Sequence, residues 1–384
     1  MTQHATSPFD EVIDRRASDS LKWSRYRDRD VLPLWVADMD FRSPPAVIKA
    51  LEERVAHGVY GYGLPPTALI DAIQRHLAND FSWDIQPDWL VWLPGVVTGL
   101  NLACRSVGTT GDEVVTLVPV YPPFLSAPRL SQRQLVTVRL TQQPHHWEID
   151  FDQLERAITP RTRLILLCNP HNPVGRVFSR SELEQLAELA IRYDLVICSD
   201  EIHAGLVLAT DTRHIPIASV APEVASRTIS LQAPSKTFNI PGLGCAFAVI
   251  SDPVLRHRYR QSMEQIVPHV NILGLTAAWA AYQHGGEWLR DLLVYLRGNQ
   301  DIVLRAIQEM PGLKATSAEA TYLTWIDARG TGFADPADFF LQGGVALSNG
   351  ADFDGDGFVR LNFGCPRALL IQALERMKTA LAAR

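Results

Sequence analysis

The sequence predicts an α/β fold in which a mostly parallel sheet is covered by helices on both faces, followed by a smaller α+β domain. Runs that are apolar at almost every position alternate with helical segments through the first three quarters of the chain. Strands of parallel sheets have this pattern, because helices bury them on both faces. We therefore expect an N-terminal segment over 1–45 that packs on the small domain, a large domain over 46–284 and a small domain over 285–384.

The bulk composition limits the kinds of partner. The 384-residue chain is 47% apolar, has a formal net charge of −6 and shows no basic stripe, which disfavours nucleic acid and anionic membranes. Its five cysteines contain no C-x-x-C pair, which argues against a disulfide framework and a zinc site. The chain has no apolar run that would span a bilayer and no signal-peptide core at its N-terminus. We expect a cytoplasmic protein that binds neither nucleic acid nor membrane.

The N-terminal segment is polar, and its structure is the hardest to predict. Residues 1–30 indicate an irregular lead-in rather than core. Asp38 and Asp40 follow, and solvated acids in a turn are the commoner outcome for such a pair. Ser43 and Pro44 supply an N-cap and a first-turn proline for a helix that ends near residue 57. The expected inner face of this helix consists of Val47, Ile48, Leu51 and Val55.

Strands and helices are then expected to alternate. The expected strands of the large domain cover 90–93, 114–118, 134–138, 164–168, 195–199, 228–232 and 245–250. Its expected helices cover 66–79, the stretch from the turn at Gly95 to about 106, 150–157 and 179–193, where Ser179 and Glu182 form a capping box. In the small domain we expect helices over 287–308, 335–342 and 366–382 and strands over 322–327 and 358–363.

Four residues lie in the turns that follow strands of the predicted sheet: Gly95, Asn172, Asp200 and Lys236. Ligands bind beyond the carboxyl ends of such strands, so these residues are expected on one rim. The glycine turn at 95 opens a helix whose free N–H groups suit a phosphate.

Lys236 lies in an uncharged stretch, 233–243, ahead of a turn that contains proline and glycine. Desolvation would lower its pKa, and a neutral amine can attack a carbonyl to form a Schiff base. The alternative is a lysine that extends from a loop into solvent, which holds for most lysines.

Arg360 lies within the apolar strand 358–363. A buried arginine needs a partner, so either an internal salt bridge or a substrate carboxylate is expected to bind it. The preceding stretch 352–357 resembles the start of a calcium loop, but its twelfth position is Phe363 where a glutamate is needed. We therefore expect an acidic turn and no metal site.

Several motifs together resemble one enzyme family. The stretches 169–175 (NPHNPVG), 199–203 (SDEIH), 235–239 (SKTFN) and 359–362 (VRLN) resemble fold-type I pyridoxal-phosphate enzymes of the class I/II aminotransferase superfamily. The stretches 35–41 (WVADMDF) and 60–62 (YGY) look like its MalY/PatB branch, the cystathionine β-lyases or C–S lyases. The resemblance implies the fold of the pyridoxal-phosphate-dependent transferases and the cofactor pyridoxal 5'-phosphate.

The resemblance also implies roles for residues at matching positions. Lys236 would hold the cofactor covalently and act as catalytic base, assisted by Tyr121, which would also stack on the ring. Other groups would bind the ring and the phosphate: Asp200, Asn172, His203, Gly95, Val96, Val97 and Ser235. The substrate would bind to Arg360, Asn172 and Ala37. Tyr62 would reach the phosphate of a neighbouring subunit, which implies a homodimer with shared active sites.

Two positions depart from the family pattern. Many aminotransferases have a phosphate-binding serine three residues before the lysine and an arginine eight after it, where this chain has Ala233 and Gly244. No second arginine is placed by a motif to bind a distal carboxylate, which disfavours a dicarboxylate transaminase.

The reaction that the resemblance implies is α,β-elimination from an amino-acid substrate, cystathionine or another cysteine S-conjugate, to a thiol, pyruvate and ammonia. An aminotransferase on the same scaffold is the alternative, since both reactions begin with removal of the α-proton. A cofactor-binding regulatory protein is a third interpretation.

Overall fold

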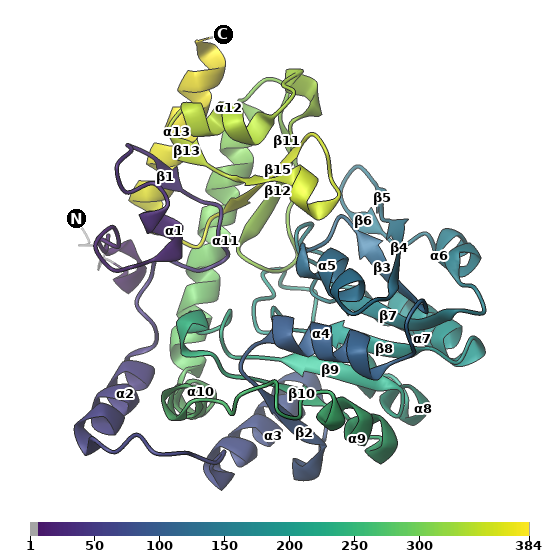
Figure 1. Ribbon diagram of the computed structural model, residues 1–384. Coiled ribbons are helices and arrows are strands. Elements are labelled where there is room, and N and C mark those ends of the chain that lie inside the picture. Colours follow the sequence, from purple (N-terminus) through teal and green to yellow (C-terminus); the bar gives the residue numbers. More distant parts are fainter. Residues whose placement is uncertain (1–6, 384) are drawn as a thin grey trace.

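The computed structural model describes residues 7–383, and a seven-stranded sheet forms its larger part (Figure 1). In pairing order its strands are β2 (Leu90–Leu93), β10 (Ala246–Val249), β9 (Thr228–Gln232), β8 (Val196–Asp200), β7 (Thr162–Cys168), β3 (Glu113–Val118) and β4 (Gln134–Arg139). Only β10 is antiparallel to its neighbours β2 and β9. The predicted mostly parallel sheet is therefore confirmed, with every predicted strand present.

Helices cover both faces of this sheet, as the continuous apolar strands predict. Within β7, Leu164 and Leu166 face one layer of helices, and Ile165 and Leu167 face the other. The first layer consists of α4 (Val96–Ser106), α5 (Pro123–Leu130) and α9 (Pro253–Gln261). The second consists of α6 (Phe151–Ala157), α7 (Arg180–Arg192) and α8 (Pro222–Ala225). Alternate residues of a strand point to opposite faces, so both sets of side chains are buried.

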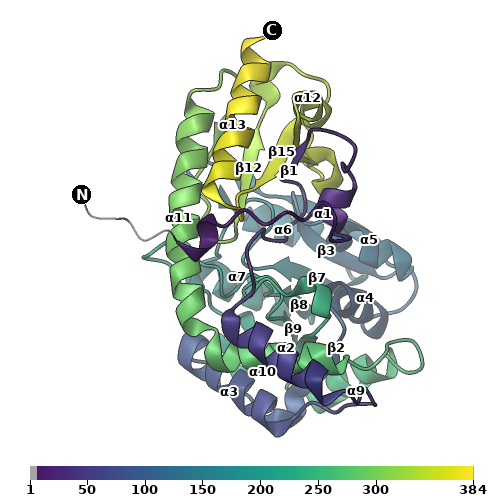
Figure 2. The same cartoon turned by 90° about the vertical axis from the view of Figure 1, so that its left-hand side faces the viewer.

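A second, antiparallel sheet contains C-terminal strands. Its order is β11 (Lys314–Ala315), β12 (Leu323–Asp327), β15 (Phe358–Asn362) and β14 (Ser348–Asn349). It packs with α11 (Gly286–Gln308), α12 (Pro336–Gln342) and α13 (Arg367–Ala382). Figure 2 shows α11 running along the height of the molecule beside both sheets. The division of the chain at residues 45 and 284 stays a prediction.

The N-terminal segment is mostly irregular, as expected, but it contributes to the core of this second unit, so the prediction that it lies outside the core is wrong. Phe9 and Trp23 are buried in the same apolar cluster as α11 and α13. The short strand β1 (Leu32–Pro33) pairs in parallel with β13 (Val345–Ala346), and α1 (Leu21–Ser24) precedes it. Large aromatic side chains anchor a segment whose average composition is polar.

The predicted helix after residue 43 is present as α2 (Pro45–His57), but its cap and inner face differ. Pro44 occupies the N-cap, and the hydroxyl of Ser43 donates to the carbonyl of Asn239. Val47 and Ala50 are the buried residues, whereas Val55 is 51% exposed. Only this small face of α2 is buried, against α10 (Ile272–His284). The sequence analysis did not predict α10, which is rich in alanine.

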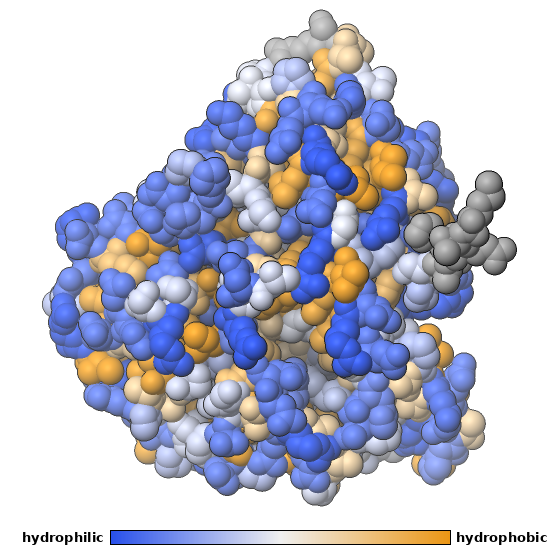
Figure 3. Space-filling view, turned by 180° about the vertical axis from the view of Figure 1, so that it is seen from behind, coloured by the Kyte–Doolittle hydropathy of each residue, from blue (hydrophilic) through white to orange (hydrophobic). Residues whose placement is uncertain are grey.

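The remaining elements complete the layers around the large sheet. Helix α3 (Thr67–Phe81) packs beside β2 and β10, and β5 (Thr141–Gln142) pairs with β6 (Trp147–Glu148) in a hairpin. Among residues 7–383, no helix is long and apolar enough to cross a membrane. The face seen in Figure 3 is mostly hydrophilic, with hydrophobic atoms in small separate groups.

Candidate active site

A cavity of about 960 Å³ lies beyond the carboxyl ends of the parallel strands, between the large sheet and the segment that contains Arg360. All but one of the predicted site residues line it, namely Ala37, Gly95, Val96, Val97, Tyr121, Asn172, Asp200, His203, Ser235, Lys236 and Arg360. They come from loops after β2, β3, β7, β8 and β9, from β15 and from the segment before α2. The topology thus brings together groups that are up to 323 residues apart, Ala37 and Arg360 being the most distant.

Lys236 follows β9 and directs its amine into the cavity. Its Nζ donates to the carbonyl oxygen of Ala37 at 2.6 Å. Burial lowers the pKa of Lys236 to about 8; the positive charge of Arg360 acts in the same direction, and the carboxylates of Asp38 and Asp200 oppose it. The amine therefore has a substantial unprotonated fraction near neutral pH, which distinguishes it from a solvated surface lysine.

Asp200 and His203 form the buried floor of the cavity at the end of β8. Asp200 Oδ1 accepts a hydrogen bond from the backbone N–H of Ile202, and burial raises the pKa of Asp200 to about 7. Burial, together with the charges of Lys236 and Arg360, lowers the pKa of His203 to about 3. Nδ1 of His203 is buried and has no hydrogen-bond partner among the described residues. A ligand in the cavity would supply the partner that Nδ1 of His203 lacks.

Arg360 does not form the internal salt bridge that the sequence analysis left open. Its guanidinium donates to Asn172 Oδ1 and to the carbonyl of Trp35, both at 2.9 Å, and to Ser348 Oγ at 3.2 Å. It also lies over the ring of Phe353, 4.6 Å from its centroid. In the part of the chain that the structure describes, no carboxylate forms an ion pair with Arg360, and its Nε has no partner.

This buried cation is suited to an anionic ligand. Burial lowers the pKa of Arg360 to about 10, so the guanidinium stays protonated at neutral pH. A planar guanidinium binds a carboxylate through two parallel hydrogen bonds. The geometry therefore favours the interpretation of Arg360 as a carboxylate-binding residue over a purely structural one.

The turn at Gly95 forms an open cradle at the start of α4. A Cβ atom built on Gly95 would meet nothing within 4 Å, and the backbone is extended there. The first N–H groups of α4, at Val96 and Val97, point out of an 11-residue helix, and Ser235 lies on the same cavity wall. Free N–H groups at a helix N-terminus favour a phosphate.

Gly244 accounts for one departure from the family pattern. Its φ is +56°, and a Cβ there would lie 3.2 Å from the carbonyl oxygen of Pro94. An arginine would be strained at this position, so the phosphate site of this chain has to use other groups.

Tyr121 and Tyr62 differ sharply in position. Tyr121 lies in the cavity wall, and burial raises its pKa. Tyr62 is fully exposed, lies between α2 and α3 and does not line the cavity of its own chain. Val59, Tyr60 and Leu64 around it are also exposed, which forms an apolar strip.

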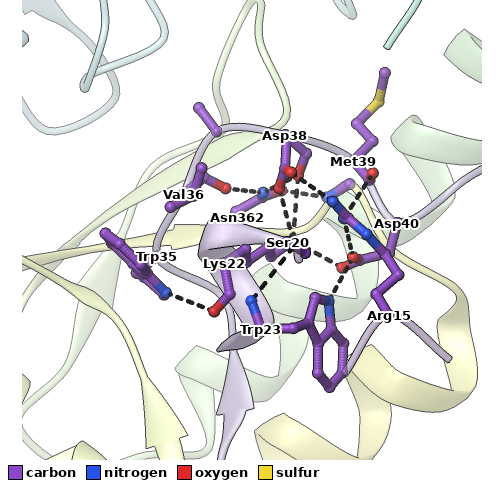
Figure 4. Close-up of polar contacts among 12 residues, drawn as sticks. Arg15, Ser20, Lys22, Trp23, Trp35, Val36, Asp38, Met39, Asp40 and Asn362 are labelled. Atoms are coloured by element: carbon purple, nitrogen blue, oxygen red, sulfur yellow. Dashed lines mark hydrogen bonds and ion pairs between the residues drawn. The ribbon is translucent and has the colours of Figure 1, made fainter. Parts of the chain in front are cut away.

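The prediction that Asp38 and Asp40 are solvated is wrong. Asp40 is 2% exposed and accepts hydrogen bonds from Lys22, Arg15 and Trp23 (Figure 4). Burial alone would raise the pKa of Asp40, but the charge and hydrogen bond of Lys22, with Arg15 and Trp23, outweigh it and hold the pKa below its usual value. The partners are 17 to 25 residues away, so no local pattern reveals them.

Two further residues escaped the sequence analysis. The hydroxyl of Tyr322 donates to the carbonyl of Ala37 at 2.9 Å, next to the amine of Lys236. Arg25 lines the mouth of the cavity and lies over the ring of Trp35. Tyr322 is the first residue of a predicted strand and Arg25 lies in a polar stretch, so neither carries a sequence motif.

The stretch 352–357, which resembles the start of a calcium loop, lies partly in the wall of the cavity. Residues 350–353 form a short 3-10 helix, and Asp354 adopts a left-handed conformation. Within residues 7–383, no group of histidine, cysteine, aspartate or glutamate side chains is arranged to hold a metal ion. Asp352 and Phe353 instead line the cavity.

Residues 29–377 match the model of the family "Aminotransferase class I and II". The chain is 36% identical to cystathionine beta-lyase PatB of Bacillus subtilis, over 97% of this chain and 100% of PatB. The crystal structure of OvoB has a TM-score of 0.96 and 48% identity, covering 98% of this chain and 99% of that one. Cystalysin of Treponema denticola, whose crystal structure contains pyridoxal 5'-phosphate, has a TM-score of 0.95 and 32% identity over 99% of this chain and 100% of its own. The cavity lies where the strands end and their loops begin, and the similarities extend over nearly the whole chain. The chain therefore belongs to the class I and II aminotransferase family.

Proposed function

We propose that this protein is a pyridoxal-phosphate-dependent C–S β-lyase. It takes a cysteine S-conjugate and one water to a thiol, pyruvate and ammonia. The single observation that carries this proposal is the convergence of Lys236, Asp200 and Arg360 on one cavity, where none of the three forms an ion pair with another described residue. The full-length relative PatB is named as a cystathionine beta-lyase, which supports the choice of reaction. The crystal structure of cystalysin contains pyridoxal 5'-phosphate, which supports the choice of cofactor.

The residues of the cavity fit pyridoxal 5'-phosphate. The amine of Lys236 would bind its aldehyde carbon, and the buried carboxylate of Asp200 would pair with the ring nitrogen. The N–H groups of Val96 and Val97, with Gly95 and Ser235, would hold the phosphate. Asn172 and the unpaired Nδ1 of His203 offer hydrogen bonds to the ring substituents. When bound, the cofactor supplies an electron sink for the electron pair left by the α-proton.

The chain's own groups then perform three tasks. Arg360 binds the α-carboxylate of the substrate and so fixes the direction of the Cα–H bond. The amine of Lys236 accepts the α-proton as general base, which its pKa of about 8 allows near neutral pH. Asp200 would keep a proton on the ring nitrogen of the bound cofactor. Tyr121, which lines the same cavity, is proposed to assist Lys236 in the second task. Loss of the thiolate from Cβ completes the elimination.

The mouth of the cavity disfavours the alternative of a dicarboxylate aminotransferase. Asp335, Asp338 and Asp352 line it together with Arg25. A distal carboxylate without an ammonium group beside it, as in a dicarboxylic amino acid, would meet three anions there and only one exposed cation. This distribution favours a substrate without a distal carboxylate or with a distal ammonium group.

We also propose that the active unit is a cytoplasmic homodimer with shared active sites. The exposed strip around Tyr62 needs a cover, because Val59, Tyr60 and Leu64 leave large apolar side chains in solvent. A second copy that covers this strip would bring Tyr62 to the phosphate end of its partner's cavity.

The test incubates purified protein with L-cystathionine in the absence of a keto acid. We expect pyruvate and free thiol in equal amounts over many turnovers, with the visible band of the cofactor restored at the end. A band that disappears after one turnover and returns only when a keto acid is added would favour the aminotransferase. A protein without a visible band would contradict the cofactor assignment.

A further inference from the structure

The segment 35–39, which precedes α2, is held by side chains at every peptide carbonyl. The donors come from the N-terminal segment, from the second sheet and the residue before its strand β12, and from the loop that carries Lys236. They are Ser348 and Arg360 at residue 35, Asn362 at 36, Lys236 and Tyr322 at 37, Lys22 and Asn362 at 38, and Arg15 and Asn239 at 39. The segment therefore connects the amine of Lys236 rigidly to the buried charges of the N-terminal segment.

In this arrangement one carboxylate oxygen of Asp38 accepts no hydrogen bond. Its Oδ2 forms an ion pair with Arg15 at 2.8 Å. Its Oδ1 is buried, has no hydrogen-bond partner among residues 7–383 and lies 3.6 Å from Nζ of Lys22. Arg15 and Lys22 both also bind Asp40 (Figure 4). Two cations thus form ion pairs with two carboxylates, and the oxygen without a hydrogen bond belongs to Asp38, the one next to Ala37.

Several ionisable groups face the amine of Lys236. Asp38 and Asp200 are the anions whose charges favour its protonated form, and Arg360 is the cation that disfavours it. His203, uncharged at neutral pH, lies on the same cavity, and the hydroxyl of Tyr322 shares the carbonyl of Ala37 with the amine. In the proposed function Asp200 pairs with the cofactor ring. Asp38 is then the anion that remains for the amine.

We propose that Asp38 is a positioning residue for Lys236. The carboxylate, held by Arg15, and the carbonyl of Ala37 orient the amine toward the α-proton and stabilise the ammonium that forms when the amine accepts it. The proton moves from the substrate Cα to Nζ, the electron pair of the C–H bond stays with the substrate, and Asp38 exchanges no proton. This inference rests on the proposed function in one respect: the proton that Lys236 accepts comes from the substrate.

The test measures the protonation of Lys236 in full-length, cofactor-free protein. Trace reductive methylation with formaldehyde and cyanoborohydride modifies unprotonated amines, and peptide mass spectrometry reports Lys236, with the exposed Lys49 as internal reference. In the wild type we expect a midpoint near pH 8. Asp38→Asn should lower it by about one pH unit, because a nearby anion favours the ammonium. Asp38→Glu should restore it, and Asp338→Asn, at the mouth of the same cavity, should leave it unchanged.

The direction of the shift separates an electrostatic role from simple damage. If Asp38→Asn only loosened the segment, water would reach the amine and the midpoint would rise toward that of an ordinary lysine. An unchanged or raised midpoint would therefore overturn the proposal. If Asp38→Asn does not fold, Asp38→Ser serves instead. It also removes the anion, so the midpoint should again fall, and an unchanged or raised one would contradict the role.

The same experiment is independent of the lyase reaction. A lowered midpoint in Asp38→Asn, in a protein that forms no pyruvate from L-cystathionine, would keep the role of Asp38 and reject the proposed function. Pyruvate formation with an unshifted midpoint would do the reverse.

Discussion

Lys236, Asp200 and Arg360 are withdrawn from solvent around one cavity, and burial moves the pKa of each away from its ordinary value. Elsewhere in the described chain, buried charges such as Lys22 and Asp40 neutralise one another. A buried charge without a partner costs stability, so its presence indicates that a ligand completes it. The buried ionisable groups therefore fall into two sets. One set neutralises itself and stabilises the fold, and the other is left for cofactor and substrate.

Replacing Arg360 tests its role at this scale. Arg360→Gln should raise KM for a cysteine S-conjugate and lower kcat/KM by about 30-fold, since a hydrogen bond between charged groups contributes about 2 kcal/mol. Steady-state kinetics measures this effect, with the exposed Arg305→Gln as matched control. A KM equal to that of the wild type would show that Arg360 does not bind substrate.

The raised pKa of Asp200 predicts how stability depends on pH in the cofactor-free protein. The pKa lies at about 7 in the folded chain, against an ordinary value of 3.8. Between these values the folded protein retains a proton that the unfolded chain has released, so the free energy of unfolding falls as the pH rises. Asp200→Asn removes this term. Its stability relative to the wild type should increase from about pH 4 to about pH 7, by at most about 4 kcal/mol.

Urea unfolding at several pH values checks this expectation. Asp338→Asn, at the mouth of the cavity, should give a curve parallel to that of the wild type. If the free energy of unfolding of Asp200→Asn also runs parallel to that of the wild type across the pH range, Asp200 is not desolvated in the folded protein.

At the element scale, the start of α4 shows how a helix contributes to the site. The sequence places Gly95 between a strand and a helix, and the structure leaves open space where a side chain would begin. The extended backbone there accommodates any residue. The fold therefore does not require a glycine at this position, whereas the proposed phosphate cradle would.

Gly95→Ala should separate these two requirements. We expect thermal stability of the cofactor-free protein to stay nearly unchanged, while affinity for pyridoxal 5'-phosphate falls on the order of 10-fold, because a methyl group intrudes on the phosphate cradle. Fluorescence titration with the cofactor measures the affinity, and Gly286→Ala, at the start of α11, is the control. A stable variant with normal affinity would place the phosphate elsewhere.

At the scale of the whole molecule, the exposed strip with Tyr62 links the fold to the proposed assembly. The cavity of one chain contains Lys236, but Tyr62 of the same chain points away from it into solvent. If two copies share their sites, each active site combines Lys236 of one copy with Tyr62 of the other.

Mixing two inactive variants tests this arrangement. Lys236→Ala and Tyr62→Ala should each reduce activity alone. After subunit exchange of an equal mixture, half of the dimers contain one of each, and one of their two sites is intact, so activity should recover to about one quarter of the wild type. If mixed dimers form and activity nevertheless does not recover, the active sites are not shared.

Local patterns in the sequence were sufficient for the strands of the large sheet, for several helices and for the rim on which most of the predicted site residues lie. Continuous apolar runs predicted the strands, and the capping box of Ser179 and Glu182 is present at the start of α7. Because all parallel strands end at one edge, the residues that follow them had to meet. These features depend on neighbours within a few positions, so the sequence carries them directly.

Only the tertiary structure decided which charges are neutralised and which are not. Asp40 is paired with Lys22 and Trp23, whereas Arg360 has no carboxylate among residues 7–383. The core position of the N-terminal segment and the narrow contact of α2 on α10 were likewise not foreseen. The pKa of a buried group depends on desolvation and on partners that are distant in the chain. The sequence by itself therefore determined the sheet, its rim and the family, and the packing determined the electrostatics on which the chemistry depends.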